Sequence, residues 1–326
     1  MPLIDMPREE LFKYQGISPC PSDIDEFWDK MLKKTDEHNP EPQFVKASYQ
    51  FPAAECYDLY FKGLGGDKIH CKVLKPSNLK GEAPCLLEFH GYSGSSSDWS
   101  HYIAHVSSGF VVFALDCRGQ GGLSEDLGGV RGTTRNGQII RGLDGDGPED
   151  LYFAKVFCDT VLMAKIAASM DYVDENNMGA CGGSQGGALT VACAALYPNI
   201  KYAAFNYPFL SDYKRVWEMD LCKDAYLELK EYFRRHDPYH EREDEIFYRL
   251  GYIDIQNIAK RIKASCYMQT GLMDTICPPS TQFAAYNKIK SPKKVIFAPD
   301  FGHEGVPYIS DKFLEFFIEQ AGISVE

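Results

Sequence analysis

The sequence predicts an α/β protein with a mostly parallel central sheet flanked by helices. Short, wholly apolar runs alternate with helical stretches over most of the chain, which is typical of buried parallel strands joined by crossover helices. A Gly-x-Ser-x-Gly sequence at residues 182–186 lies between an apolar run and a run of small residues, so that a strand leads in and a helix leads out. The 326 residues suffice for one large domain with a buried core, and we expect a single domain over residues 1–326.

The N-terminal part differs in character from the rest. Residues 1–40 are polar and mixed, and we expect an N-terminal extension there. Apolar side chains recur in it at helical spacing, which predicts a helix over residues 22–32 that begins with Ser22 as a cap. Over about residues 44–75, apolar and polar residues alternate around the pair Gly65-Gly66. This pattern predicts antiparallel strands joined by a tight turn.

Six apolar runs follow as candidates for the parallel strands, and two amphipathic stretches as covering helices. The strands are predicted at residues 85–90, 111–116, 178–182, 202–206, 266–270 and 294–298. The helices are predicted at residues 151–170 and 312–318.

A charged, aromatic and mostly helical segment at about residues 211–262 interrupts this alternation. It follows the fourth predicted parallel strand, so we expect it to sit over the carboxyl edge of the sheet, before the fifth strand. A lid or an oligomer contact are the two roles that fit such a helical insertion.

The composition excludes several classes of function. The net charge is −12 with neutral histidines, and lysines and arginines are scattered, so a polyanion such as nucleic acid would be repelled. The first ten residues lack the basic start and apolar core of a secretion signal, and no apolar run reaches membrane-spanning length. We therefore expect a soluble, cytoplasmic protein.

The cysteines and histidines do not indicate a disulfide framework or a metal site. The eleven cysteines are odd in number and contain no C-x-x-C pair, and most lie in apolar stretches as buried free thiols would. His101 and His105 are four residues apart but have no plausible third ligand nearby. We expect neither a metal nor an organic cofactor.

Ser184, at the centre of the Gly-x-Ser-x-Gly sequence, is the candidate nucleophile. In a strand-to-helix turn of this kind the serine is held on a sharp, strained bend with its hydroxyl exposed above the sheet. Gly182 and Gly186 suit the bend because a Cβ at either place would strike the neighbouring strand or helix. A plain glycine-rich turn is the alternative interpretation.

A serine hydroxyl needs a histidine to take its proton and a carboxylate to orient that histidine. Asp274 follows the fifth predicted parallel strand and His303 follows the sixth, which is the order serine, acid, histidine. Asp274 could instead be a turn residue, and Asp300 is a rival acid on the same loop as His303. We interpret His90, which precedes a glycine at a strand end, as structural.

Ester hydrolysis also needs two hydrogen-bond donors for the oxyanion, and backbone N–H groups serve this purpose well. The first should be the amide of Gln185, directly after the nucleophile. The second should come from the loop His90-Gly91-Tyr92-Ser93-Gly94, and we assign it to the amide of Tyr92. This loop departs from the lipase-type H-G-G-G, and an ordinary glycine-rich turn is the alternative.

Together these motifs resemble those of carbohydrate esterase family 7, which contains the acetyl xylan esterases and cephalosporin C deacetylases. Its R-G-Q, G-x-S-Q-G and H-E motifs stand here at residues 118–120, 182–186 and 303–304. The resemblance runs nearly end to end and takes in His90-Gly91-Tyr92, Asp98-Trp99 and residues 249–252 and 271–274. It implies an α/β-hydrolase fold, a ring-shaped homo-hexamer and a preference for acetyl esters.

The resemblance also implies roles for individual residues. Ser184, Asp274 and His303 would form the triad, and Tyr92 and Gln185 the oxyanion pair. Tyr92, Phe209 and Ile276 would wall a small acyl pocket. The residues that would support the site structurally are Arg118, Gly119, Gln120 and Glu304.

These inferences lead to the hypothesis of a serine esterase that removes acetyl groups from small acetylated molecules through an acetyl-enzyme. Acetylated xylo-oligosaccharides and cephalosporin C-like esters are the expected substrates. A peptidase or acyl-peptide hydrolase on the same scaffold is one alternative, since a triad does not distinguish ester from amide. A binding protein that has lost catalysis is the other.

Overall fold

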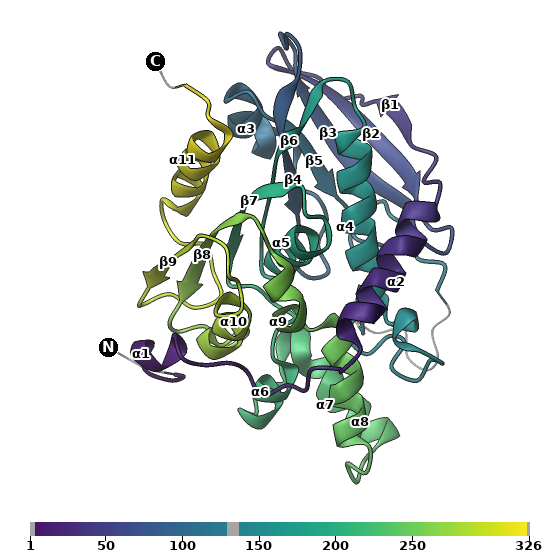
Figure 1. Cartoon of the computed structure of the whole chain (residues 1–326), viewed down its shortest axis with the longest axis vertical. Coiled ribbons are helices and arrows are strands. Elements are labelled where there is room, and N and C mark those ends of the chain that lie inside the picture. The colour runs from purple at the N-terminus through teal and green to yellow at the C-terminus, as the bar shows by residue number, and fades with distance from the viewer. Residues whose placement is uncertain (1–3, 129–136, 325–326) are drawn as a thin grey trace.

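One mixed sheet lies at the centre of the computed structural model, which describes residues 4–128 and 137–324 (Figure 1). Its strands in spatial order are β1-β2-β3-β5-β4-β6-β7-β8-β9. Their bounds are β1 (Gln43–Lys46), β2 (Ala54–Lys62), β3 (Lys68–Pro76), β4 (Ala83–Phe89), β5 (Val111–Leu115), β6 (Val173–Gly183), β7 (Ile200–Asn206), β8 (Ser265–Gly271) and β9 (Lys293–Ala298).

Strands β4 to β9 are the parallel part of the sheet, and each coincides with one of the apolar runs predicted as parallel strands. The main difference in bounds is that β6 begins at Val173, which pairs with Ala83 of β4 before a shift in register. The apolar pattern did not reveal this start, because the polar residues 174–177 separate Val173 from the apolar run that begins at Met178.

Strands β1, β2 and β3 pair antiparallel, as the alternating pattern predicts. β3 also pairs antiparallel with β5, which joins the three antiparallel strands to the parallel part of the sheet. The turn between β2 and β3 contains Gly65 and Gly66 at φ 97° and 92°. Glycine adopts such positive φ values without the steric cost that a Cβ would add.

Helices cover both faces of the sheet. One face carries α4 (Tyr152–Ala168), α5 (Gln185–Leu196) and α10 (Pro279–Tyr286), with α2 (Ile24–Glu37) packed on α4. The other face carries α3 (Ile103–Ser107), preceded by the 3₁₀ turn η1 (Trp99–Tyr102), and α11 (Ile309–Ala321), which lie on the same side of the sheet in Figure 1. Alternate side chains of β4 show the two layers, since Leu87 packs under α4 and α5 and Leu86 packs under α11.

The helical insertion lies between β7 and β8, where the sequence predicts it. Its elements are α6 (Tyr213–Glu218), η3 (Asp224–Tyr226), α7 (Leu227–His236), α8 (Glu243–Leu250), η4 (Gly251–Ile253), α9 (Ile255–Ile258) and η5 (Ala259–Arg261). The N-terminal extension runs along it. Tyr14 Oη donates to Asp212 at 2.7 Å, and Trp28 Nε1 donates to the Tyr252 carbonyl at 3.1 Å.

One local expectation is wrong, and several short elements were not predicted. The Ser22 cap is wrong: α2 begins at Ile24, its N-cap residue is Asp23, and no side chain accepts a capping hydrogen bond. The Ser22 backbone amide donates to Tyr248 Oη at 3.3 Å. Helix α10 was not predicted, since all its residues are buried and a helix buried all round has no polar face to create a period. The short helix α1 (Arg8–Leu11) and turn η2 (Pro148–Asp150) were also not predicted.

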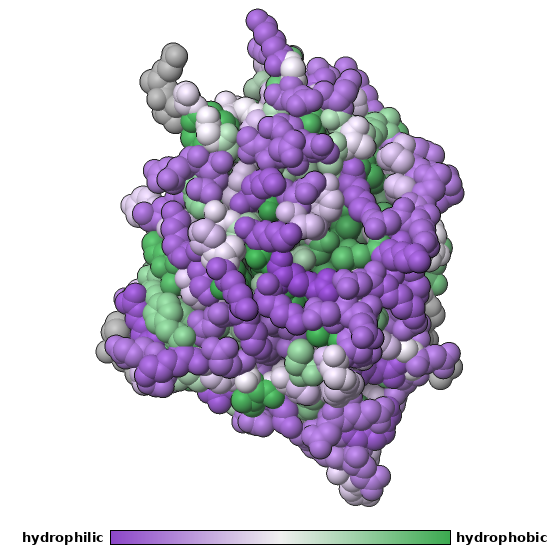
Figure 2. Space-filling view, in the orientation of Figure 1, coloured by the Kyte–Doolittle hydropathy of each residue, from purple (hydrophilic) through white to green (hydrophobic). Residues whose placement is uncertain are grey.

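The surface in the orientation of Figure 2 is mainly hydrophilic, with hydrophobic residues in small, separate groups. Among the described residues, no helix combines the length and the apolar character that crossing a membrane requires. The same residues contain no cluster of three or more potential metal ligands. All cysteines are free thiols, and of these Cys20 is exposed and the others are buried.

Candidate active site

The strand-to-helix turn predicted around Ser184 is present. β6 ends at Gly183 and α5 begins at Gln185, with Ser184 between them at φ 57° and ψ −120°. This positive φ is rare for a residue with a Cβ, and it is maintained because the flanking backbone is fixed. The Ser184 amide donates to the Asn206 carbonyl at 3.1 Å, and the Ser184 carbonyl accepts from the Phe209 amide at 3.0 Å.

The glycines around Ser184 are required by close backbone approach. A Cβ on Gly186 would lie 2.0 Å from the Phe89 carbonyl oxygen, and a Cβ on Gly182 would lie 2.6 Å from the same atom. A Cβ on Gly183 would meet nothing nearer than 3.5 Å. The motif therefore needs glycine at its first and last positions, because there the turn presses against the end of β4.

Asp274 and His303 converge on Ser184 from the loops after β8 and β9. His303 Nε2 lies 2.8 Å from Ser184 Oγ, and His303 Nδ1 lies 2.8 Å from Asp274 Oδ2. With the proton on Nδ1 donated to the carboxylate, Nε2 is the acceptor for the serine hydroxyl. This chain of hydrogen bonds can remove a proton from Ser184 as its oxygen attacks an electrophile.

The carboxylate of Asp274 is fixed from several sides. Its Oδ1 accepts the amides of Ile276 and Cys277 at 2.9 and 2.8 Å. Its side chain is 0% exposed, whereas that of His303 is 15% exposed, so the histidine alone of this pair reaches solvent. Asp300, the rival acid, has no hydrogen bond to His303 among the described contacts.

The ring of His303 also packs against Tyr207, with ring centroids 4.5 Å apart. Tyr207 directly follows β7, and its amide donates to the Gln269 carbonyl at 2.9 Å. Tyr207 was not among the site residues predicted from the sequence. Its place directly after a parallel strand is the signal that could have found it, since the other site residues follow parallel strands too.

The two predicted oxyanion donors lie at the ends of adjacent strands. Phe89 of β4 is in register with Gly182 of β6, so the loop after β4 meets the turn at Ser184. The Gly94 amide closes a turn onto the Gly91 carbonyl at 3.1 Å, which leaves the Tyr92 amide outside that hydrogen bond. Gln185 is the first residue of α5, so its amide has no acceptor within the helix.

His90 supports this loop, as the sequence interpretation has it. Its Nδ1 lies 2.7 Å from the Gly91 carbonyl, and its Nε2 accepts the Cys117 amide at 3.0 Å. Burial lowers the pKa of the imidazole, which keeps it neutral and able to accept that amide.

The comparison with known families now gives these contacts a context. A family model described as acetyl xylan esterase (AXE1) matches residues 1–320. This chain belongs to the acetyl xylan esterase family. The family resemblance expected from the three motifs is thereby confirmed.

Individual relatives agree with this assignment. Acetyl esterase Axe7A of Xylanibacter ruminicola is 27% identical over 288 residues, which are 86% of this chain and 62% of that protein, so the chain spans less than two thirds of this curated relative. Acetyl xylan esterase 1 from Thermoanaerobacterium sp. JW/SL YS485 is 50% identical, with a TM-score of 0.95 over 97% of this chain and 99% of that one. An acetyl xylan esterase from Paenibacillus sp. R4 is 33% identical, with a TM-score of 0.91 over 96% and 99%. The predicted α/β-hydrolase fold is confirmed.

In this member of the acetyl xylan esterase family, Arg118 is buried and paired with two carboxylates. Its guanidinium donates to both oxygens of Asp159 on α4 at 2.7 Å and to Asp67 of the β2–β3 turn at 2.6 Å. It thereby ties the loop after β5 to two distant elements. Gly119 follows at φ 61°, where a Cβ would lie 2.7 Å from the Asp126 side chain.

Gln120 reaches the site through Gln185. The two amides bond each other, with Gln120 Nε2 2.8 Å from Gln185 Oε1 and Gln185 Nε2 3.1 Å from Gln120 Oε1. Gln120 also donates to Tyr152 Oη at 3.0 Å. Gln185 is completely buried, so this pair fixes the residue that follows the nucleophile.

The remaining predicted residues lie around the same centre. Phe209 is buried, and its ring centroid lies 5.4 Å from that of Tyr92. Ile276 lies in the loop after β8, where its backbone amide donates a hydrogen bond to Asp274 Oδ1. Glu304 Oε1 accepts the Gly302 amide at 3.1 Å, a contact that shapes the loop carrying His303.

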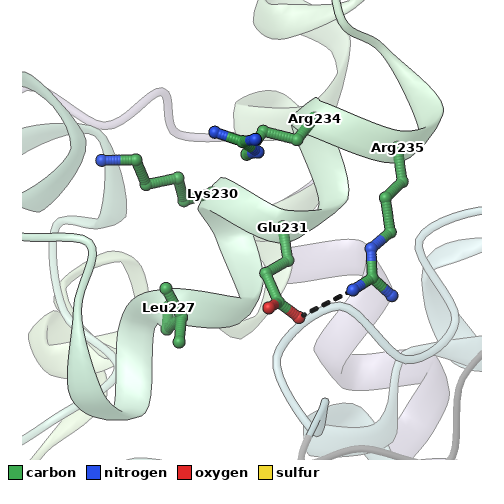
Figure 3. A pocket seen from close by; sticks show the side chains of 5 residues that line it. All are labelled: Leu227, Lys230, Glu231, Arg234 and Arg235. Carbon is green, nitrogen blue, oxygen red and sulfur yellow. Dashed lines mark ion pairs between the residues drawn. The ribbon is translucent and has the colours of Figure 1, made fainter.

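A separate hollow of about 560 Å³ lies on the solvent side of α7 (Figure 3). It is lined by Leu227, Lys230, Glu231, Arg234 and Arg235, which share one helical face. Arg235 pairs with Glu231 across 3.7 Å. The hollow includes none of the triad residues, and the opposite face of α7 is buried.

Proposed function

We propose that this chain is a serine esterase that removes acetyl groups from acetylated sugars through an acetyl-enzyme. The observation that carries the proposal is the unbroken series of hydrogen bonds from Ser184 Oγ through His303 to Asp274. Membership of the acetyl xylan esterase family supports the choice of an acetyl ester as substrate.

In the first half of the reaction, Ser184 Oγ attacks the acetyl carbonyl carbon while its proton moves to His303 Nε2. The carbonyl π electrons move to oxygen, and the oxyanion binds the amides of Tyr92 and Gln185. When the tetrahedral intermediate collapses, the bond to the sugar oxygen breaks. His303 returns its proton to that oxygen, and the sugar leaves as a neutral alcohol.

The second half repeats these steps with water. The water oxygen attacks the acetyl-enzyme carbonyl carbon while His303 Nε2 accepts a proton from the water. Collapse of the second intermediate breaks its bond to Ser184 Oγ, which takes the proton back from His303. The acetic acid that is released loses its remaining proton to water. Asp274 stays ionised throughout and stabilises the imidazolium that forms twice in each cycle.

Replacing the nucleophile tests the proposal directly. We expect Ser184→Ala to lower turnover of a chromogenic acetate by on the order of 10⁴-fold or more, because no other group supplies the attacking oxygen. The melting temperature of the variant checks that it folds. An unchanged rate in the folded variant would refute the proposal.

The acyl group is proposed to lie against Tyr92, Phe209 and Ile276. A small pocket of this kind accepts acetate and excludes longer chains, so activity should drop sharply beyond about three carbons. The measurement is kcat/KM for a series of chromogenic esters from acetate to octanoate. Equal values for acetate and octanoate would contradict the assignment of these walls.

Acetylated xylo-oligosaccharides are the substrates we propose, with cephalosporin C-like acetyl esters as further substrates. The family assignment and the similarity to the structures of two acetyl xylan esterases support this. We propose a cytoplasmic homo-hexamer as the working form, on the family resemblance alone. Acetate released from a panel of acetylated mono- and oligosaccharides tests the substrate, and light scattering of the purified protein tests the assembly.

A further inference from the structure

Glu228 is a buried acid of the helical insertion that the proposed reaction does not use. It lies in the first turn of α7, on the face that turns toward the site, and is only 5% exposed. A carboxylate buried to this extent costs free energy unless hydrogen bonds compensate it. Its partners therefore indicate why it is there.

Both oxygens of Glu228 are used, and they join three segments far apart in the sequence. Oε1 accepts the hydroxyl of Tyr92, in the loop after β4, through a short hydrogen bond. Oε2 accepts the amide of Ile140 at 3.1 Å. The insertion thus holds the side chain of the residue whose amide is proposed to bind the oxyanion.

The effect of Glu228 continues through Tyr92 to the nucleophile. The Tyr92 ring contacts Phe209, whose own amide donates to the Ser184 carbonyl at 3.0 Å. Tyr92 precedes Ser93, which has φ 57°, so the loop carries a strained residue next to the proposed donor. Such a loop needs an external contact to keep one conformation.

The charge of Glu228 is balanced between opposing effects. Burial raises its pKa to about 7, while the hydroxyl of Tyr92 and the amides of Ile140 and Ile139 favour the ionised form. Tyr92 and Ile140 are both hydrogen-bond donors to Glu228, so the ionised carboxylate satisfies them and a protonated one would lose an acceptor.

We propose that Glu228 is a positioning residue that fixes the loop after β4, residues 90–94, through the hydroxyl of Tyr92. The inference rests on the proposed esterase function and assigns the insertion a part in it. An oxyanion donor acts on the transition state more than on the bound substrate, so its misplacement lowers kcat and leaves KM nearly unchanged.

The test is a double-mutant cycle on chromogenic acetate with Tyr92→Phe, Glu228→Leu and the double variant. We expect each single change to lower kcat by roughly 10-fold, with KM within about 2-fold. Because both changes break the same hydrogen bond, the double variant should be no slower than the slower single variant. Glu228→Gln should recover most of the lost kcat, because its oxygen can accept the Ile140 amide while its NH₂ group donates to the Tyr92 hydroxyl oxygen.

The matched control is Tyr226→Phe. Tyr226 packs on the other side of Phe209, with centroids 4.5 Å apart, and its buried hydroxyl has no side-chain hydrogen-bond partner among the described residues. This change removes an equivalent atom from the same aromatic cluster and should leave kcat within about 2-fold.

The outcomes separate the inference from the function on which it rests. A wild-type protein without esterase activity would overturn both. An active wild type whose single variants keep full kcat, or whose double variant loses the product of the single effects, would overturn the role of Glu228 alone. A raised KM at unchanged kcat would also overturn it, because that pattern marks substrate binding and not transition-state stabilisation.

Discussion

At the scale of single residues, the strain at Ser184 follows from its neighbours. Gly182 and Gly186 let the turn press onto the Phe89 carbonyl, and that contact fixes the bend that exposes the serine. We expect Gly186→Ala to destabilise the protein by about 2–4 kcal/mol, since the added carbon meets backbone and not a movable side chain. Chemical denaturation measures the loss. The matched variant Gly183→Ala, at a place with ordinary contacts, should cost much less, and equal costs would contradict this account.

Asp274 offers a test of the hydrogen-bond direction in the triad. In Asp274→Asn the amide side chain can donate to Nδ1, which favours the tautomer with its proton on Nε2, facing Ser184. We expect kcat for a chromogenic acetate to fall by on the order of 10⁴-fold, while the fold is retained. Reaction of Ser184 with a fluorophosphonate should slow in parallel. A variant that keeps wild-type kcat would show that Asp274 does not orient the histidine.

The residues that could be predicted from the sequence are those that a local pattern marks. Ser184 lies in a motif with a steric cause, and Asp274 and His303 follow apolar strands whose carboxyl ends share one edge. Glu228 could not be found in this way, because its role depends on a contact between segments 136 positions apart. Nothing in the insertion's own sequence distinguishes it from neighbouring acids.

At the scale of elements, α2 connects the N-terminal extension to the body of the molecule. Trp28 on its inner face is fully buried, stacks on Phe157 of α4 with centroids 5.7 Å apart, and bonds the Tyr252 carbonyl of the insertion. One side chain thus joins three elements. The helix itself was predictable from its period, but its partners on α4 and the insertion were not.

We expect Trp28→Ala to lower the free energy of unfolding by about 3–5 kcal/mol, through lost burial and a remaining cavity. Lys33→Ala, on the solvent side of the same helix, should change it by less than about 0.5 kcal/mol. Urea titration followed by circular dichroism measures both. A Trp28 variant as stable as the Lys33 variant would mean that the extension contributes no stability.

At the scale of the whole molecule, buried carboxyl groups make stability depend on pH. Asp254 is completely buried, and burial together with the charge of Asp212 raises its pKa to about 7. Between about pH 4 and pH 7 the folded protein keeps this proton and the unfolded chain releases it. The contribution of Asp254 to stability therefore falls as the pH rises through that range.

Asp254→Asn removes this dependence and retains a side-chain oxygen that can accept a hydrogen bond. We expect the free energy of unfolding of the wild type, relative to the variant, to decrease from about pH 4 to about pH 7 and to level off above. Urea titrations at a series of pH values give the difference directly. Curves that stay parallel over the range would exclude a raised pKa at Asp254.

The sheet order explains why the site was easier to predict than its surroundings. Adjacent parallel strands bring the loops after β4, β6, β7, β8 and β9 to one edge, whichever residues separate them in the chain. The helices of the insertion and the extension obey no such rule. Their positions depend on side-chain packing between distant segments. Such contacts leave no repeating pattern of apolar residues in the sequence from which they could be predicted.

The distribution of the cysteines has a practical consequence for following how this molecule opens. Burial raises the pKa of the thiols at Cys20, Cys71, Cys117 and Cys181, but Cys20 alone is exposed while every other thiol is buried. Alkylating reagents attack accessible thiolates, so iodoacetamide should add a single adduct to the native chain. Each further adduct seen by mass spectrometry would then report local unfolding around a buried cysteine, so the number of adducts measures partial unfolding.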